Sequence, residues 1–232
     1  MSEKDNNQSR IKTTMTTYSR IASKYASSLT DQDDPVMRAE TRTLFMDRLK
    51  GKRILEVGCG PGKDSKAFFD AGLDVAATDN CADFIEIVRE RYPEMESKRM
   101  DMTKVTFADN TFDGIYGFAS FLHLPRPVST PTLKEFWRVL NPGGLLYLTL
   151  ISSSMHREYI ISDWAGVENN PLLFTCYDEP EFCEMLQDTG FADIEILHVK
   201  CEAYENLPRL QERGIKVFHI AAQTAKEIRT TS

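Results

Sequence analysis

Three glycines follow a short apolar run in the sequence ILEVGCGPGKD, at Gly58, Gly60 and Gly62. The apolar run predicts a buried strand, and the residues after Gly62 predict a helix. In an α/β sheet such a turn lies at the carboxyl end of a strand, where glycines let the backbone approach a ligand and a helix N-terminus presents free N–H groups. The turn therefore indicates a nucleotide-like ligand, although a purely structural turn remains an alternative. Lys63 occupies the position where a dinucleotide fingerprint needs Gly or Ala, which argues against a pyrophosphate.

An acidic residue, Asp79, stands at the end of the next predicted strand, 21 residues after Gly58. This placement brings its carboxylate opposite the glycine-rich turn, where it can accept hydrogen bonds from both hydroxyls of a ribose. Asp79 could also serve as an N-cap for a helix that begins near Cys81, but that role does not explain why it accompanies the turn. The two features together favour a nucleoside-containing cofactor.

Short strands and helices alternate after Gly51, and these elements must position the turn and Asp79. Periodicity predicts strands over 52–57, 73–78, 98–100, 112–118, 145–151, 191–200 and 215–222. It predicts helices over 63–71, 81–92, 130–140 and 178–187, the third with Thr130 as cap and Pro131 in its first turn, the fourth with Asp178 as N-cap. Such alternation predicts an α/β fold: βαβ units with right-handed crossovers, forming a doubly wound, mostly parallel sheet covered by helices on both faces.

The chain outside this alternation divides into a cap, a lid and two tails. Residues 1–10 are polar and are predicted to form a mobile tail. Residues 11–50 are predicted to form an N-terminal helical cap, with one or two amphipathic helices over Ile11–Leu29 and another from Asp34-Pro35 to about Leu49. The main domain is expected over 51–222, and an irregular segment at 152–175 is either a substrate lid or a surface excursion. Residues 223–232 are expected to be a C-terminal tail.

Composition and charge exclude several classes of protein. Hydrophobic residues make up 41% of the 232 residues and charged residues 27%, which is ordinary for a globular protein and excludes disorder over most of the chain. The net charge of −7 has the wrong sign for a general binder of phosphate backbones, so a nucleic-acid substrate is disfavoured. No apolar run approaches the roughly 18 to 20 residues of a membrane span, and the polar N-terminus does not match a secretory signal. A cytoplasmic protein without a membrane partner is expected.

The cysteines do not indicate a disulfide framework or a structural zinc site. There are five of them, an odd number, with no CxxC pair, and the chain has no HExxH motif. Free thiols in a reducing compartment are the expected state, and inert packing is their expected role.

Taken together, the motifs resemble the class I S-adenosylmethionine-dependent methyltransferases, most closely the small soluble bacterial-type members. The resemblance covers roughly residues 18–222 and is carried by EVGCGPG at 56–62, Asp79, Asp101-Met102, FDGIYGFASFLHLP at 112–125, RVLNPGGLLYLTL at 138–150 and Gly190-Phe191. It implies a Rossmann-like methyltransferase fold with a seven-stranded sheet in the order 3-2-1-4-5-7-6, strand seven antiparallel, and S-adenosyl-L-methionine as the cofactor. It says little about the substrate.

The resemblance also implies which residues contact the cofactor. The loop of Gly58, Cys59, Gly60 and Gly62, backed by Glu56, would hold the methionine part. Asp79 would bind the ribose diol, and Asn80 or Cys81 would lie against the adenine. Asp101 would accept from the adenine amino group, with Met102 beside the ring. Phe118 and Ala119 would form the floor near the sulfonium, and Tyr18 and Tyr25 of the cap would close over the cofactor.

Methyl transfer from a sulfonium is an in-line displacement in which the cofactor already carries the activated group. The protein must align donor and acceptor, exclude water and in some cases remove one proton. His123 is the catalytic candidate, because an imidazole with a pKa of about 6.5 can take a proton from a hydroxyl or ammonium acceptor. It could instead cap the turn or line the pocket. Trp164, Phe174 and Tyr177 suggest an apolar or aromatic wall, although such residues more often belong to a core.

Departures from known patterns narrow the function. No Asn-Pro-Pro-Tyr tetrad follows the fourth strand, so methylation of adenine N6, cytosine N4 or glutamine is unsupported, and no catechol-type metal set is present, so a metal is not needed. A nicotinamide oxidoreductase would need Gly at 63 and a Tyr-x-x-x-Lys, and the chain has neither. We expect methyl transfer to a small-molecule acceptor through oxygen, nitrogen or sulfur. The alternative is a non-catalytic regulatory or partner protein that binds S-adenosylmethionine. The acceptor and the oligomeric state are left open.

Overall fold

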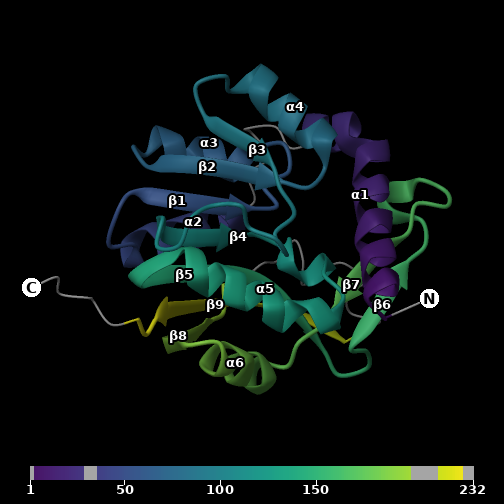
Figure 1. Cartoon of the computed structure of the whole chain (residues 1–232). Coiled ribbons are helices and arrows are strands. Elements are labelled where there is room, and N and C mark those ends of the chain that lie inside the picture. Colours follow the sequence, from purple (N-terminus) through teal and green to yellow (C-terminus); the bar gives the residue numbers. More distant parts are fainter. Residues whose placement is uncertain (1–2, 29–35, 200–213, 227–232) are drawn as a thin grey trace, which may run out of the picture.

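A sheet of seven strands runs through the protein (Figure 1). The computed structural model describes residues 3–28, 36–199 and 214–226. The strands of this sheet are β1 Arg53–Val57, β2 Asp74–Asp79, β3 Glu96–Arg99, β4 Phe112–Gly117, β5 Leu140–Ser153, β8 Phe191–Leu197 and β9 Ile215–Thr224. Their order is β3-β2-β1-β4-β5-β9-β8, and β9 runs antiparallel to both neighbours while the other pairs are parallel. The predicted fold class and the sheet order implied by the resemblance are confirmed.

Successive residues of each strand point to opposite faces of the sheet, and helices cover both faces. On one face Tyr116 packs against Phe45 of α2 (Val36–Arg48) and Phe68 of α3 (Lys63–Asp70), with ring centroids 5.3 and 4.9 Å away. On the other face lie Phe136 of α5 (Arg126–Val139) and Phe182 of α6 (Glu179–Asp188). The helix α4 (Ala82–Arg91) packs against β2 and β3. Each of these helices overlaps one that the sequence predicts.

The N-terminal helix α1 (Glu3–Ser28) is longer than the sequence predicts. Residues 3–10 belong to it, so the prediction of a mobile tail over residues 1–10 is wrong for that stretch. The reason is tertiary, because Arg10 pairs with Glu158 at 2.6 Å and Asn7 and Ile11 are buried. The predicted helix start at Asp34-Pro35 lies outside the described residues. Within the part of the chain that the structure describes, no helix is both long and apolar enough to cross a membrane.

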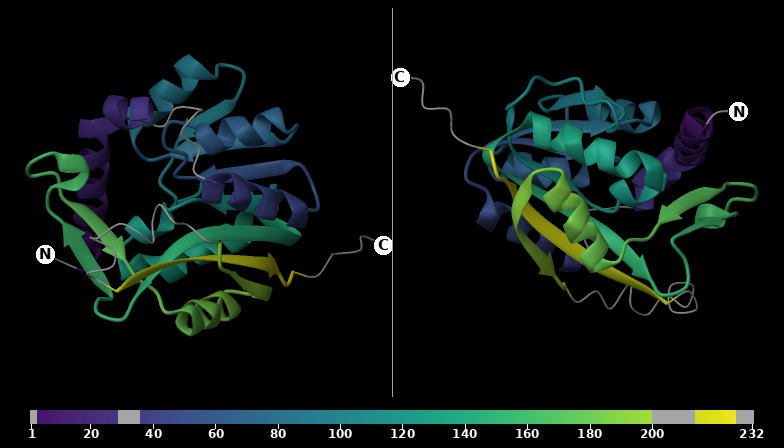
Figure 2. Two further views of the ribbon diagram at one scale, coloured as in Figure 1. Left: turned by 180° about the vertical axis from the view of Figure 1, so that it is seen from behind. Right: turned by 60° about the horizontal axis from the view of Figure 1, so that its bottom comes forward.

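The predicted irregular lid at 152–175 contains a β-hairpin. Its strands are β6 (Glu158–Ile161) and β7 (Leu172–Thr175), which pair antiparallel, with a 3₁₀ turn over Trp164–Gly166 between them. All four residues of β7 are buried, and in β6 three residues are half-buried while Ile160 is exposed. Neither strand therefore alternates between buried and exposed residues, which is the pattern that predicts a half-buried strand. Figures 1 and 2 show the hairpin beside α1.

Three predicted boundaries also shift. The helix α5 begins at Arg126 and not at the Thr130 cap, so Pro131 lies inside it. The first backbone N–H of α5, that of Arg126, donates to Glu158 Oε1 at 2.9 Å, and this cap from a distant strand leaves no local signal in the sequence. The predicted strand at 145–151 is part of the longer β5, and β9 extends to Thr224, into the predicted tail.

A buried ion-pair cluster joins α2 to the first turn of α3. Asp64 has a side chain that is 0% exposed, and it lies 2.7 Å from Arg38 Nη2 and 2.7 Å from Arg42 Nη1. Arg38 Nε also donates to both Asp64 oxygens at 2.9 Å. A buried carboxylate with two guanidinium partners is costly to disrupt, because removal of the carboxylate leaves two largely desolvated positive charges without it.

We predict that Asp64→Ala lowers the free energy of unfolding by about 3 to 5 kcal/mol, because it removes the carboxylate between Arg38 and Arg42, whose side chains are only 12% and 10% exposed. Asp70→Ala is the matched control on the same helix. Asp70 is 58% exposed and pairs with Lys66, so its loss should cost less than about 1 kcal/mol. Urea denaturation of both variants measures the difference, and equal losses would contradict a special role for the cluster.

Candidate active site

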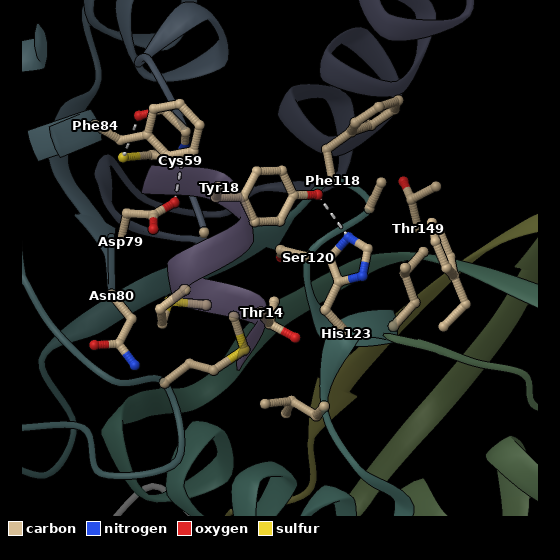
Figure 3. A pocket seen from close by; sticks show the side chains of 18 of the residues that line it. Thr14, Tyr18, Cys59, Asp79, Asn80, Phe84, Phe118, Ser120, His123 and Thr149 are labelled. Carbon is tan, nitrogen blue, oxygen red and sulfur yellow. Dashed lines mark hydrogen bonds between the residues drawn. The ribbon is translucent and has the colours of Figure 1, made fainter. Parts of the chain in front are cut away.

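A cavity of about 630 Å³ lies at the carboxyl ends of β1, β2 and β4, between the sheet, α1 and the hairpin (Figure 3). Its volume is in the range of small-molecule sites, and its position is the one at which α/β sheets bind ligands. The loop after β1, the end of β2, the residues after β3 and the residues after β4 form one half. The hairpin and the ends of β5 and β9 contribute to the other half of the cavity, and residues of α1 line both halves.

The glycine-rich loop forms one wall. Gly58, Cys59 and Gly60 line the cavity, whereas Gly62 does not. A Cβ added to Gly60, whose φ is +54°, would have no atom within 4 Å, so the backbone there is open to a ligand. A Cβ on Gly62 would lie 2.8 Å from Val88 of α4, so Gly62 serves helix packing. Burial raises the pKa of the Cys59 thiol, which keeps this thiol protonated and in a packing role.

Glu56 lies behind the loop and is not part of the cavity lining. It is buried and accepts a hydrogen bond from the Ser65 hydroxyl of α3. Burial, together with the negative charge of Asp64, raises the pKa of Glu56. Glu56 therefore lies where a residue can support the glycine-rich loop from the side away from the cavity.

Asp79 ends β2 and faces the cavity (Figure 3). Its Oδ2 accepts the Gly60 N–H at 2.9 Å and its Oδ1 accepts the Cys81 N–H at 2.8 Å. The carboxylate therefore holds the glycine loop and bonds to the start of α4 at the same time. Burial raises the pKa of Asp79 to about 6, and the backbone donors oppose that rise. A carboxylate offers about four acceptor sites, so these backbone donors leave the Asp79 oxygens able to accept from a ligand as well.

Further along this wall, Asn80, Asp101 and Met102 line the cavity. Cys81 does not, because it packs with Ala22 of α1. Asp101 Oδ1 accepts from the Thr103 N–H at 2.9 Å and from its hydroxyl at 2.8 Å. Of the two residues that the resemblance offered beside the adenine, the structure brings Asn80 to the site.

Aromatic side chains join α1 to α4 over the cavity. Tyr18 and Tyr25 both line it, and their ring centroids lie 6.1 Å apart. The ring of Phe84, on α4, lies 5.8 Å from each of them. Phe84 is not among the predicted site residues, because its only signal in the sequence is an aromatic residue in the first turn of the helix after Asp79.

His123 lies on the 3₁₀ turn Phe121–His123, and both of its ring nitrogens have partners, of which Figure 3 shows the Tyr18 hydroxyl. Nδ1 lies 2.7 Å from the Leu173 carbonyl oxygen, which can only accept, so Nδ1 carries the proton. Nε2 then accepts from the Tyr18 hydroxyl at 2.9 Å. Burial lowers the pKa of His123 to about 4, so the imidazole is neutral at pH 7. The pair forms a chain of hydrogen bonds that can carry a proton from the cavity to His123.

The floor of the cavity includes Phe118 and Ala119, directly after β4. Ala119 has a φ of 50°, a strained conformation of the kind that gathers at functional sites. The guanidinium of Arg38 lies 4.6 Å from the centre of the Phe118 ring and also lines the cavity. Arg38 is not among the predicted site residues, because no local sequence pattern connects a residue of α2 with the end of β4.

The arrangement can hold a nucleoside-type cofactor along the loop, Asp79 and Asp101, with a second molecule in the half that faces His123. Within the described ranges, no group of three or more His, Cys, Asp or Glu side chains is arranged to hold a metal ion.

Of the three predicted wall residues, Trp164 and Phe174 line the cavity, while Tyr177 belongs to the core and bonds to the Ser129 hydroxyl at 2.6 Å.

Comparison with known proteins gives a consistent result. The family described as "Methyltransferase domain" matches residues 54–144. A demethylmenaquinone methyltransferase of Renibacterium salmoninarum is 27% identical over 195 residues, 76% of either chain. Phosphoethanolamine N-methyltransferase 1 of Triticum aestivum is 30% identical over 67% of this chain, which spans about a third of that relative, 32% of its length.

Solved structures share the fold. The 1,6-didemethyltoxoflavin-N1-methyltransferase of Burkholderia thailandensis, solved with 1,6-didemethyltoxoflavin and S-adenosylhomocysteine, matches with a TM-score of 0.69. The match covers 95% of this chain and 91% of that one, at 15% identity. A likeness at that identity establishes the common fold.

We predict that His123 stays neutral, with its proton on Nδ1, down to a pH near 4, because burial opposes the charged form. Nitrogen-15 NMR of the imidazole across pH 4 to 8 measures this, and His123→Asn identifies the resonance. A resonance that titrates at about 6.5, the ordinary histidine value, would contradict the buried and hydrogen-bonded arrangement.

Proposed function

The chain belongs to the class I S-adenosylmethionine-dependent methyltransferase superfamily, and on this premise we propose that it methylates a small molecule held against Tyr18 and His123. The observation that carries the proposal is the hydrogen bond between these two residues inside the cavity, 2.9 Å long. It stands where the half that is suited to the cofactor meets the half that is open to an acceptor (Figure 3). A proton-accepting pair at such a junction is suited to an acceptor that loses a proton on methylation.

We assign the cofactor's parts to this chain's residues by their chemistry. The acceptor capacity that remains on the Asp79 carboxylate suits the hydroxyls of a ribose. Asn80 and Met102 suit the adenine ring, and Asp101 Oδ2 suits its amino group, since both hydrogen bonds of Asp101 within the described chain use Oδ1. When bound, S-adenosylmethionine supplies a methyl group already activated on a sulfonium.

Arg38 suits the carboxylate of the cofactor's methionine part. It lines the cavity near the glycine loop, and its pairing with Asp64 uses Nε and Nη2. A guanidinium has five N–H donors, so further donors remain for a second carboxylate. The same side chain can therefore anchor α2 and contribute to cofactor binding.

Tyr18 and His123 act together on the acceptor's proton. The Tyr18 oxygen can accept a hydrogen bond from the acceptor while its own O–H points to His123 Nε2. Because the pKa of His123 is low, the imidazole is a weak base, and it takes the proton only as methyl transfer makes the acceptor acidic. Leu173, whose carbonyl oxygen accepts from Nδ1, keeps Nε2 free of its own proton and directed to Tyr18.

Other features favour a small acceptor in a reducing compartment. The chain carries a net charge of −7, which disfavours nucleic acid. The thiols of Cys59, Cys81 and Cys176 are free and buried. Free thiols are typical of the cytoplasm, where we place the protein.

We predict that Asp79→Ala weakens the binding of S-adenosylhomocysteine by about 1 to 3 kcal/mol, because two ribose hydrogen bonds are lost. Asp74→Ala, at the exposed start of the same strand, is the control and should leave the affinity unchanged. Isothermal titration calorimetry measures both, and NAD should give no heat of binding. An unchanged affinity in Asp79→Ala, or binding of NAD, would count against the assignment.

We predict that His123→Asn and Tyr18→Phe each lower the maximal rate at least about 100-fold, with little change in cofactor affinity, because the path for the acceptor's proton is broken. Tyr147→Phe is the control, since it removes a buried hydroxyl that has no hydrogen-bond partner among the described residues and lies outside the cavity lining. Steady-state kinetics with the natural acceptor, across pH, measures the effect. Losses below about fivefold would leave catalysis to alignment alone.

A further inference from the structure

The half of the cavity beyond Tyr18 has an aromatic wall. Tyr159 of β6 and Phe174 of β7 lie side by side, with ring centroids 5.1 Å apart and planes only 6° from parallel. The Trp164 ring lies 5.3 Å from that of Phe174, at 59°. All three line the cavity, and aliphatic side chains of β5 and β9, Ile151 and Val217, complete this half. Such a wall presents flat apolar surface against which a ring can stack.

Hydroxyl groups are set into the same half. Thr14 lies one helical turn before Tyr18 on α1, lines the cavity and is 2% exposed. Its hydroxyl has no hydrogen-bond partner in the described part of the chain. Figure 3 shows Thr14 and Tyr18 on the same side of α1, with His123 facing them. A buried hydroxyl without a partner is unfavourable, and a polar atom of a bound molecule would satisfy it.

Charge divides the two halves of the cavity. The charged side chains that line it, within the described residues, are Arg38, Asp79 and Asp101, and all three lie on the side assigned to the cofactor. The acceptor side presents aromatic rings, aliphatic side chains and hydroxyls. A phosphate or ammonium group placed against these surfaces would lose its hydration without a counter-charge, which is costly. A neutral acceptor fits the same surfaces at no such cost.

We propose, on the basis of the proposed methyl transfer, that the acceptor is a flat, uncharged aromatic or heteroaromatic ring that carries a weakly acidic O–H or N–H. The ring lies against Phe174, the acidic group meets Tyr18, and a neighbouring polar substituent reaches Thr14. The acceptor's oxygen or nitrogen forms a bond to the methyl carbon as the methyl–sulfur bond breaks and leaves its electron pair on sulfur. The acceptor's proton passes to Tyr18 while the Tyr18 proton passes to His123 Nε2.

The test uses the full chain saturated with S-adenosylhomocysteine at pH 7.5, with calorimetric titration of defined probes. The O–H probe is 2-naphthol and the N–H probe is benzimidazole. Decahydro-2-naphthol keeps the ring skeleton and the hydroxyl without aromaticity, and phosphoethanolamine is the charged probe. We expect at least one aromatic probe to bind at least about fivefold tighter than the saturated alcohol, since aromatic pairs add to simple burial, and phosphoethanolamine not to bind.

Variants separate the wall from general stability. Phe174→Leu keeps an apolar side chain but removes the ring. It should lower the affinity for the aromatic probe about fivefold and leave the affinity for the saturated alcohol unchanged. Ile160→Ala, on the same hairpin but 56% exposed, should change neither. Thr14→Val should abolish the extra affinity that 2,3-dihydroxynaphthalene has over 2-naphthol. Unchanged affinity of each variant for S-adenosylhomocysteine shows that it is folded.

The outcomes are distinct. If the wild-type chain fails to bind S-adenosylhomocysteine, the proposed function falls and this inference falls with it. If it binds S-adenosylhomocysteine but the saturated alcohol or phosphoethanolamine binds as tightly as the aromatic probes, or neither aromatic probe binds, the inference alone is overturned. Equal behaviour of Phe174→Leu and Ile160→Ala towards the aromatic probe would also overturn it.

Discussion

The buried pairing of Asp64 with Arg38 and Arg42 is the interaction on which the site depends. Asp64 lies in the first turn of α3, directly after the glycine loop, so the cluster fixes that loop from behind through the helix that follows it. Arg38 also reaches the Phe118 ring at the end of β4, 4.6 Å away. One guanidinium thus links α2, α3 and the floor of the cavity. A buried cluster of this kind fixes the relative positions of the elements it joins more than it adds net stability, because the cost of desolvating the charges offsets much of their attraction.

A second interaction, made by Glu158, holds together the elements that close the cavity on its other side. Glu158 of β6 pairs with Arg10 of α1 and accepts the first backbone N–H of α5. It therefore holds the hairpin, the N-terminal helix and the helix after His123 in one arrangement. With these elements in place His123 is half-buried, and the desolvation of its ring accounts for its low pKa and neutral state. The covering elements set the chemistry of the site as well as its access.

The cavity combines two environments. Strand ends and the glycine loop supply backbone donors and carboxylates, because the carboxyl ends of parallel strands meet at one edge. The hairpin supplies aromatic rings from a segment that is not part of the main sheet. Tyr18 spans the boundary, since its ring touches Phe84 on one side and its hydroxyl reaches His123 on the other. The hairpin and the main sheet therefore give the two halves of the cavity different linings.

Local patterns in the sequence were sufficient for the succession of strands and helices in the main sheet, the glycine turn and the place of Asp79, because hydrophobic periodicity and turn chemistry act over a few residues. Contacts between distant residues decided the rest. Arg10 and Glu158 are separated by 148 positions, and their pairing extends α1 and helps to position the hairpin. Arg38 also reaches the floor of the cavity through contacts with distant residues, Asp64 and Phe118. The tautomer and pKa of His123 depend on Leu173, Tyr18 and burial, which only the folded chain brings together.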